Sequence, residues 1–184
     1  PVCFPQFSGR GPLSKHGFAR TSNEWDIESM SSEDGVCRLS LTLTDSDATR
    51  ATWPHAFLLR YVITLSDVAL CTEMELVNSG EAPLTFTAAL HTYFAVDDVL
   101  QVKVMGLRGL TYEDNANGGV SSGPEAQEEV GLPGEVDRVY LDAPERLAVR
   151  LGNSKGEQIV VTKSAGFRDA VLWNLGEAKA PSMS

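Results

Sequence analysis

Hydrophobic and polar residues alternate along much of this chain, and a period of two is typical of half-buried β-strands. In VCRLSLTLT (36–44), Cys37 and three leucines share one face, while Arg, Ser and Thr side chains take the other. The strand pattern continues through FLLRYVITL (57–65), ALCTEMELV (69–77) and LTFTAALH (84–91). We expect these four segments to form a meander, in which the NSGEAP turn leads into the last strand.

Turn-forming Gly, Asn, Pro and Asp residues separate the remaining strand candidates. These candidates are 100–105, 134–140, 146–151, 157–163 and 169–173. Nine short strands with almost no helical spacing predict an all-β sandwich or barrel. The stretch 115–134, rich in Gly, Ser and Glu, is expected to be a mobile or functional loop, because long loops without secondary structure are uncommon in compact domains.

Composition limits the classes of function. A chain of 184 residues that is 42% hydrophobic can bury one sizeable core, so we expect a single domain over residues 1–184. Its 15 basic and 25 acidic residues give a net charge of −10, which disfavours binding to the phosphate backbone of nucleic acids. No apolar run approaches the roughly 18 residues of a membrane-spanning helix. We therefore expect neither a nucleic-acid partner nor a membrane span.

The cysteines and histidines bear on cofactors and on the cellular compartment. Cys3, Cys37 and Cys71 are widely spaced, which suits reduced core thiols better than a disulfide framework or a zinc site. Reduced thiols and the absence of an N-glycosylation sequon predict an intracellular protein. Three scattered histidines predict no metal site, and the sequence lacks a dinucleotide-binding fingerprint, so we expect no cofactor.

A basic segment interrupts this acidic chain. GRGPLSKHGFAR (9–20) contains Arg10, Lys15 and Arg20, with His16 among them and no acidic residue. Such a cluster favours an anionic small molecule, whose phosphate or carboxylate it would bind through charge-assisted hydrogen bonds. The segment lacks the spacing of a phosphate loop. A solvated basic loop is the alternative that charge alone leaves open.

A histidine ends the last strand of the predicted meander. His91 falls on the face that carries Thr85, Thr87 and Ala89, whose small side chains would leave room for a polar ligand. The imidazole group is the commonest general acid or base near neutral pH. An exposed or structurally hydrogen-bonded histidine fits the same pattern, and periodicity does not decide between these interpretations.

Five short motifs in order carry a resemblance to a known family: PVCFPQF, HGFAR, LHTYF, EVDRVYLD and DAVLWN. They resemble the hexose-6-phosphate mutarotases, or glucose-6-phosphate 1-epimerases, of the aldose 1-epimerase (galactose mutarotase-like) superfamily, over nearly the whole chain. The resemblance implies a large antiparallel β-sandwich, of which residues 1–184 would be the central portion, incomplete at both termini. It implies an isomerase that interconverts the α and β anomers of a hexose 6-phosphate without a cofactor.

The resemblance also implies roles for residues at matching positions. His91 matches the general acid that protonates the ring oxygen of the sugar. His16 lies at the sugar site, and Asp137 matches a carboxylate that binds sugar hydroxyls, although a turn or surface aspartate is the simpler interpretation of Asp137. The resemblance places the catalytic base, a glutamate, beyond Ser184, so Glu177 is not assigned that role.

Phosphate binding is assigned to the basic segment. Arg20 matches a phosphate-binding arginine, Lys15 stands where relatives contribute a further cation, and Arg10 is added from its charge alone. A phosphosugar is therefore the expected partner, and these cations disfavour a mutarotase of free galactose-type sugars. The sequence WNLG (173–176) replaces the WNPW that is usual in the family and changes the expected wall of the site.

The departures from the family pattern leave one alternative of another class. A non-catalytic carbohydrate-binding or complex-assembly subunit, with a protein partner, would retain the same fold. In either case we expect a cytoplasmic or organellar protein. A plastid is included, since a transit peptide would precede residue 1.

Overall fold

The computed structural model describes residues 1–183, which contain fourteen β-strands, one α-helix and four 3-10 helices. Every pair of strands in the sheets is antiparallel. The prediction of an all-β antiparallel fold is therefore confirmed. The chain divides into two compact units, unit 1 (Pro1–Tyr93) and unit 2 (Phe94–Ser184). The single domain remains a prediction. No helix within residues 1–183 has the length and hydrophobicity required to cross a membrane.

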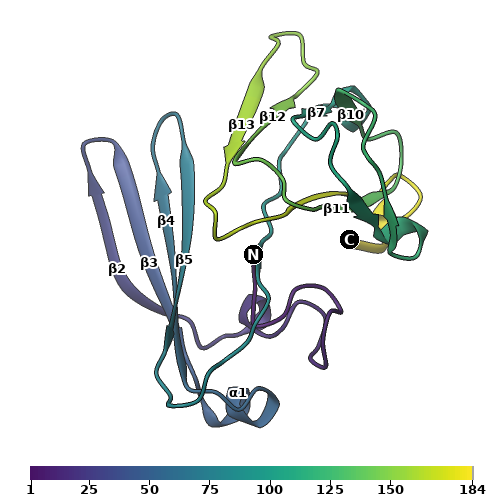
Figure 1. The fold of residues 1–184 in the computed structure, drawn as a ribbon. Helices are drawn as coiled ribbons and strands as arrows, with labels where there is room; N and C mark the ends of the chain where they lie inside the picture. Colours follow the sequence, from purple (N-terminus) through teal and green to yellow (C-terminus); the bar gives the residue numbers. More distant parts are fainter. Residues whose placement is uncertain (184) are drawn as a thin grey trace. The chain divides into compact units, whose positions relative to one another are not determined.

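Unit 1 is built around a four-stranded sheet with the order β2-β3-β4-β5 (Figure 1). Its elements are β1 (Val2–Cys3), η1 (Ala19–Thr21), β2 (Asp26–Glu33), β3 (Val36–Thr44), α1 (Asp47–Thr52), β4 (Phe57–Leu65), β5 (Leu70–Asn78) and β6 (Ala89–Leu90). The predicted strands 36–44 and 57–65 are confirmed residue for residue, and 69–77 is displaced by one position.

The fourth strand of the predicted meander is wrong. The fourth strand of the sheet is instead β2, at the opposite edge, beside β3. Only Ala89–Leu90 of the predicted strand 84–91 is a strand, and it pairs with β1. Strand β2 lacks a clear alternation because a bulge between Ile27 and Ser29 shifts its register. The residues directly before β6 form no strand. They contact the start of the chain through single hydrogen bonds, such as the 3.1 Å bond that Thr87 N–H donates to the Pro5 carbonyl.

Helix α1 is also absent from the predicted elements. The Ser46 hydroxyl accepts a hydrogen bond from Thr49 N–H over 3.3 Å, and Ser46 N–H donates to the Thr49 hydroxyl over 2.8 Å. This reciprocal capping satisfies backbone donors at the start of a short helix. The sequence S-D-A-T carried that signal, although the helix is too short to show a 3.6-residue period.

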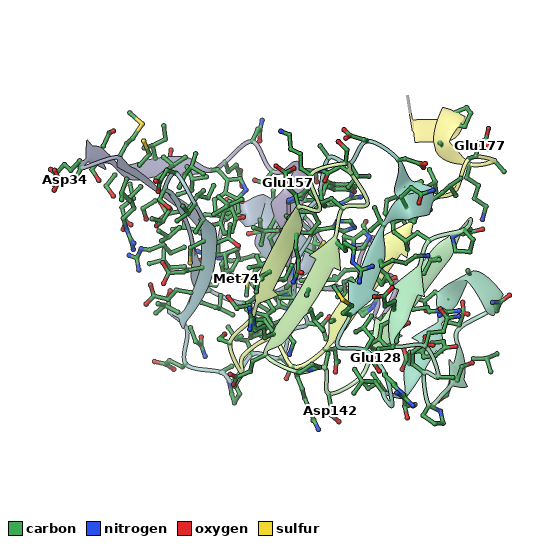
Figure 2. All side chains as sticks on the ribbon, turned by 90° about the horizontal axis from the view of Figure 1, so that it is seen from above. Asp34, Met74, Glu128, Asp142, Glu157 and Glu177 are labelled. Atoms are coloured by element: carbon green, nitrogen blue, oxygen red, sulfur yellow. The ribbon has the colours of Figure 1, made fainter. Side chains whose placement is uncertain are left out.

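The register of the sheet places most of its apolar side chains on one face, which we call the apolar face. It comprises Ile27, Met30, Leu39, Leu41, Leu43, Leu59, Tyr61, Ile63, Leu65, Leu70, Met74 and Leu76. At one end Leu43 and Leu59 are fully buried in a core with Phe4. At the other end Met30 is 78% exposed and Leu65 is 52% exposed. Figure 2 shows Asp34 at the tip of the β2–β3 hairpin.

The cysteines depart from the prediction of core thiols. Cys3 is buried in β1, but Cys37 and Cys71 are exposed. Cys37 lies on the apolar face at the end where that face is exposed, and Cys71 lies on the opposite face of the sheet. A period of two identifies which residues share a face, but it does not show how far along a strand the core extends.

The polar face of the same sheet carries a ladder of charges across three strands. Arg60 on β4 donates two hydrogen bonds of 2.8 Å to the Glu28 carboxylate and also pairs with Glu75 on β5. The Ser40 hydroxyl adds a 2.7 Å bond to Glu28. The bonds from Arg60, followed by the bond from Ser40, lower the pKa of Glu28 to about 2.

This lowered pKa predicts a loss of stability in acid. Because the folded protein holds the Glu28 proton less tightly than the unfolded chain, the stabilisation is complete above about pH 5 and is lost as the pH falls toward 2. In Glu28→Gln, the urea midpoint should therefore fall less steeply between pH 5 and pH 2.5 than in the unmodified protein. The same substitution at exposed Glu33 is the control. Parallel curves for Glu28→Gln and the unmodified protein would contradict the assignment.

Unit 2 contains two further antiparallel sheets, with the strand orders β10-β7-β12-β13 and β14-β11-β8-β9. Its elements are η2 (Val99–Gln101), β7 (Lys103–Met105), β8 (Tyr112–Asp114), η3 (Asn115–Asn117), β9 (Val120–Ser122), β10 (Glu129–Gly131), β11 (Val136–Tyr140), β12 (Arg146–Arg150), β13 (Gln158–Thr162), β14 (Ala170–Asn174) and η4 (Ala180–Met183). Tyr140, Leu107 and Val130 are the most deeply buried residues of its core.

The strand predictions hold for most of unit 2. The last four predicted strands correspond to β11, β12, β13 and β14 within two residues at each end, whereas 100–105 is a 3-10 helix followed by the short strand β7. The predicted structureless loop 115–134 is wrong, because it contains η3, β9 and β10. Strands of three residues are too short for an alternating pattern to identify.

Candidate functional site

The short strand β1 brings together two histidines that are far apart in the sequence. Its pairing with β6 sets Val2 opposite Leu90, and the following His91 N–H donates to the Pro1 carbonyl over 2.9 Å. Just after β1, Phe4 forms a bridge with Gly17, the neighbour of His16. The rings of His16 and His91 consequently lie 6.1 Å apart in an edge-to-face arrangement.

Gly17 is necessary for this approach. Its φ is +66°, a left-handed conformation that side chains disfavour, and a Cβ atom there would lie 2.2 Å from the Phe4 carbonyl oxygen. The Phe4 carbonyl accepts hydrogen bonds from Phe18 N–H (3.0 Å) and Ala19 N–H (3.1 Å). The HGFAR motif is thus fixed to the start of the chain at its glycine.

Aromatic rings surround the histidine pair. His91 stacks on Tyr93 with 4.7 Å between centroids and 19° between planes, and the Phe7 ring lies 5.7 Å from His16. The Arg10 guanidinium lies 5.8 Å from the Phe7 centroid, within reach of a cation–π attraction. The arrangement offers two half-buried imidazoles, which can donate or accept protons, beside a cation.

Lys15 and Arg20 accompany these residues in unit 1. Both are exposed, Lys15 directly before His16 and Arg20 in the 3-10 helix η1. Burial raises the pKa of the Cys3 thiol, and the positive charge of Arg20 acts against this increase, so Arg20 lies within electrostatic range of β1. The three predicted cations and the two histidines therefore belong to the same unit.

Asp137 lies on β11 in unit 2. Its side chain is half-buried, and its Oδ1 accepts a 2.9 Å hydrogen bond from the amide of Asn115, the first residue of η3. Trp173 on β14 is its partner in the register. A carboxylate held in this way can accept further hydrogen bonds from hydroxyl groups. That Asp137 shares a sugar site with the histidines remains a prediction.

A charged network joins β11, the strand of Asp137, to β8 and to Glu125. Arg138 pairs with Asp114 on β8 at 3.5 Å and with buried Glu125 at 3.1 Å, and the Tyr140 hydroxyl donates to Glu125 over 2.9 Å. Burial raises the pKa of Tyr140 to about 12, although its hydrogen bond with Arg138 acts against the increase. Because Asn115 follows Asp114 directly, the network also positions the amide that holds Asp137.

The Asn115–Asp137 bond gives a testable prediction. Replacing Asn115 with alanine should leave the Asp137 carboxylate free to rotate and raise KM for a sugar substrate by about tenfold, the equivalent of one hydrogen bond, with a smaller effect on kcat. Asn153→Ala, which removes an amide that binds Glu157 between β12 and β13, is the control. An unchanged KM in Asn115→Ala would show that Asp137 needs no such support.

The WNLG sequence, which spans the end of β14, has a local explanation. Gly176 adopts φ +76°, and a Cβ atom there would lie 2.8 Å from the Glu135 nitrogen. Asn174 donates a 2.7 Å bond to the Gly134 carbonyl. The chain turns closely against the residues that precede β11, and only glycine fits there. Glu177 is exposed in the segment that follows (Figure 2).

Two residues that sequence reasoning did not identify support the site. Gln6 is buried and binds the loop that contains Arg10 and Lys15, and Asn115 holds Asp137. A single amide in the apolar stretch PVCFPQF is the available signal for Gln6, and the hydrophobic pattern gives no signal for Asn115. In the part of the chain that the structure describes, no three His, Cys, Asp or Glu side chains cluster as metal ligands.

Comparison with known families identifies the fold of this chain. All of it, residues 1–184, matches the family described as aldose 1-epimerase. The chain belongs to the aldose 1-epimerase family. The resemblance carried by the five motifs is thereby confirmed, and the edge-to-face histidines and the Asp137 strand are features of an aldose 1-epimerase family member.

Curated relatives of this aldose 1-epimerase family chain carry one common name. A protein of Cenchrus ciliaris named "Putative glucose-6-phosphate 1-epimerase" is 35% identical over 191 residues, which cover 100% of this chain and 57% of the relative. A protein of the same name from Salmonella typhimurium is 34% identical over 189 residues, covering 100% and 60%. The chain thus spans about three fifths of the length of these relatives.

Solved structures share the aldose 1-epimerase family fold. A crystal structure named as a putative mutarotase from Salmonella typhimurium has a TM-score of 0.86 and 31% identity, and the match covers 100% of this chain and 60% of that one. A Synechocystis protein has a TM-score of 0.81 and 26% identity, covering 96% and 63%. The predicted mutarotase-like sandwich class is confirmed by these likenesses.

Proposed function

We propose that this protein interconverts the α and β anomers of a hexose 6-phosphate, with glucose 6-phosphate as the first candidate. Membership of the aldose 1-epimerase family and the names of its curated relatives support an epimerase. The observation that carries the proposal is the pair of histidine rings 6.1 Å apart beside the basic segment. Imidazoles serve the proton transfers, and the cations favour a phosphorylated sugar over a neutral one.

The proposed reaction opens and recloses the sugar ring. His91 donates a proton to the ring oxygen while a base removes the proton of the anomeric hydroxyl, so the bond between C1 and the ring oxygen breaks and an aldehyde forms. Rotation about the C1–C2 bond exposes the other face of the aldehyde, and the reverse proton transfers close the ring. We assign the base to no residue of 1–183, in accord with the family resemblance, which places it after Ser184.

The other predicted residues bind the substrate in this proposal. His16 hydrogen-bonds the sugar beside His91, and Asp137 accepts hydrogen bonds from its hydroxyls. Lys15, Arg20 and Arg10 neutralise the phosphate. Charge-assisted hydrogen bonds of this kind are roughly twice as strong as neutral ones, so the phosphate would supply much of the binding energy.

The test is anomer exchange measured by NMR with the intact protein. Glucose 6-phosphate should exchange faster in its presence, whereas glucose and galactose at the same concentration should not. Lys15→Ala and Arg20→Ala should each raise KM for the phosphosugar. Equal acceleration of galactose would indicate a mutarotase of free sugars. No acceleration by a folded protein would favour a non-catalytic carbohydrate-binding subunit.

A further inference from the structure

The loop that carries Arg10, Lys15 and His16 is built on one buried side chain. Gln6 is only 3% exposed, and its amide Nε2 donates to the carbonyls of Ser8 and Leu13, each over 3.1 Å. Its Oε1 accepts a 3.0 Å bond from Leu13 N–H. Gln6 therefore ties together two points of the loop that lie five positions apart and uses both ends of its amide to do so.

The two ends of this loop meet at His16. His16 N–H donates to the Ser8 carbonyl over 3.0 Å, and Ser8 N–H donates to Nδ1 of the His16 ring over 3.2 Å. Ser8 and His16 both have a left-handed backbone, with φ of 52° and 70°. Side chains disfavour that conformation, so the surrounding bonds must hold it. Gln6 supplies one of them directly, through the same Ser8 carbonyl.

The Ser8 bond determines which nitrogen of His16 carries the proton. A backbone N–H can only donate, so Nδ1 must offer its lone pair to Ser8. In a neutral imidazole the single proton then lies on Nε2, which becomes a hydrogen-bond donor. A donor at this position suits an oxygen of a sugar better than an acceptor would.

We propose that Gln6 is a positioning residue, which fixes the 8–16 loop so that His16 keeps the Nε2–H tautomer and presents a donor to the substrate. The inference about the tautomer stands on the loop alone, and its kinetic consequence rests on the proposed function. Gly11 leaves space for the Gln6 amide, because a Cβ atom there would lie 2.4 Å from Gln6 Oε1 and displace the amide. Gly9, by contrast, has open space within 4 Å of such an atom.

The test is the tautomer of His16, read from the couplings of its ring nitrogens in a ¹⁵N-labelled protein at a pH where the ring is neutral. The unmodified protein should show the Nε2–H form alone. Gln6→Leu should give a mixture of both forms and speed exchange of the Ser8 amide hydrogen by tenfold or more. Gln158→Leu, the same change at an exposed position in β13, is the control.

A second pair of variants covers the case in which Gln6→Leu does not fold. Gly11→Ala keeps the Gln6 residue but displaces its amide group from the loop. It should therefore give the same mixture of tautomers, whereas Gly9→Ala should not. A single Nε2–H tautomer retained in folded Gln6→Leu or in Gly11→Ala would overturn the proposal.

A kinetic measurement distinguishes failure of this proposal from failure of the proposed function. In Gln6→Leu, KM for glucose 6-phosphate should rise by about twofold to tenfold while kcat changes less. An equal mixture of tautomers halves the fraction of His16 that can donate, and loss of the whole hydrogen bond gives about tenfold. If the unmodified protein does not exchange anomers at all, the proposed function fails, and the tautomer measurement alone then decides the role of Gln6. A mixed tautomer combined with an unchanged KM would overturn the claim that His16 donates to the substrate.

Discussion

Replacing His91 with asparagine is expected to slow anomer exchange of glucose 6-phosphate by about 10²–10⁴-fold, the usual contribution of one general acid. Asparagine is of similar size and keeps a hydrogen-bond donor, but it cannot deliver a proton to the ring oxygen. The loss should appear in kcat, because the cations that are proposed to bind the phosphate lie on other segments. NMR exchange spectroscopy of the two anomers measures the rate directly.

The third histidine provides the matched control for His91→Asn. His55 lies against Trp53 with 4.5 Å between ring centroids, outside the histidine pair. His55→Asn should retain anomer exchange within about twofold, since surface or partly buried substitutions away from a site usually have small effects. Equal losses in both variants would point to unfolding, and a fully active His91→Asn would remove His91 from the mechanism.

The second large effect concerns stability. Replacing Phe4 with alanine is expected to lower the free energy of unfolding by about 3–5 kcal/mol, as is typical when a large buried side chain is deleted. Phe4 is fully buried at the centre of an aromatic cluster, with ring centroids 5.4 Å from Trp53 and 5.5 Å from Phe57. Urea denaturation followed by tryptophan fluorescence measures the change.

The same substitution at an exposed phenylalanine is the control, because it removes the same side chain without removing core packing. Phe94 is 44% exposed, so Phe94→Ala should cost under about 1 kcal/mol. Because Phe4 also bridges to Gly17, Phe4→Ala should broaden the resonances of His16 before the protein unfolds. A cost for Phe4→Ala no larger than that for Phe94→Ala would show that the cluster adds little to stability.

The strands that the sequence pattern predicts well are those with a clear face. Segments 36–44 and 57–65 alternate without interruption, and the structure reproduces their limits. Strand β2 has polar side chains on both faces around its bulge, so its sequence does not alternate and does not predict a strand. Segment 84–91 alternates as well as any other, yet most of it finds no partner strand. Alternation reports the preference of a segment, whereas pairing depends on the rest of the chain.

The sequence proposes residues for the candidate site but does not predict their contacts. Motif resemblance selected His16 and His91, but their approach depends on the pairing of β1 with β6 and on the bridge at Gly17. Both are contacts between distant segments, which no local pattern encodes. Gln6 could not be identified, because a buried glutamine is recognisable only when the carbonyl groups that it binds are placed around it.

The carboxylates of the unit 1 sheet also bear on association between copies of this protein. Strands β2 and β5 are the two edges of that sheet, and an exposed edge can pair with the edge of another molecule. The two edge strands carry five carboxylates. Glu28 and Glu75 share Arg60, and Glu73 pairs with Arg38, so an excess of negative charge remains to repel a second such edge. Acid removes this repulsion but leaves the hydrogen-bonding groups of both edges available. Fibrous or amorphous association at low pH would therefore nucleate along these two strands.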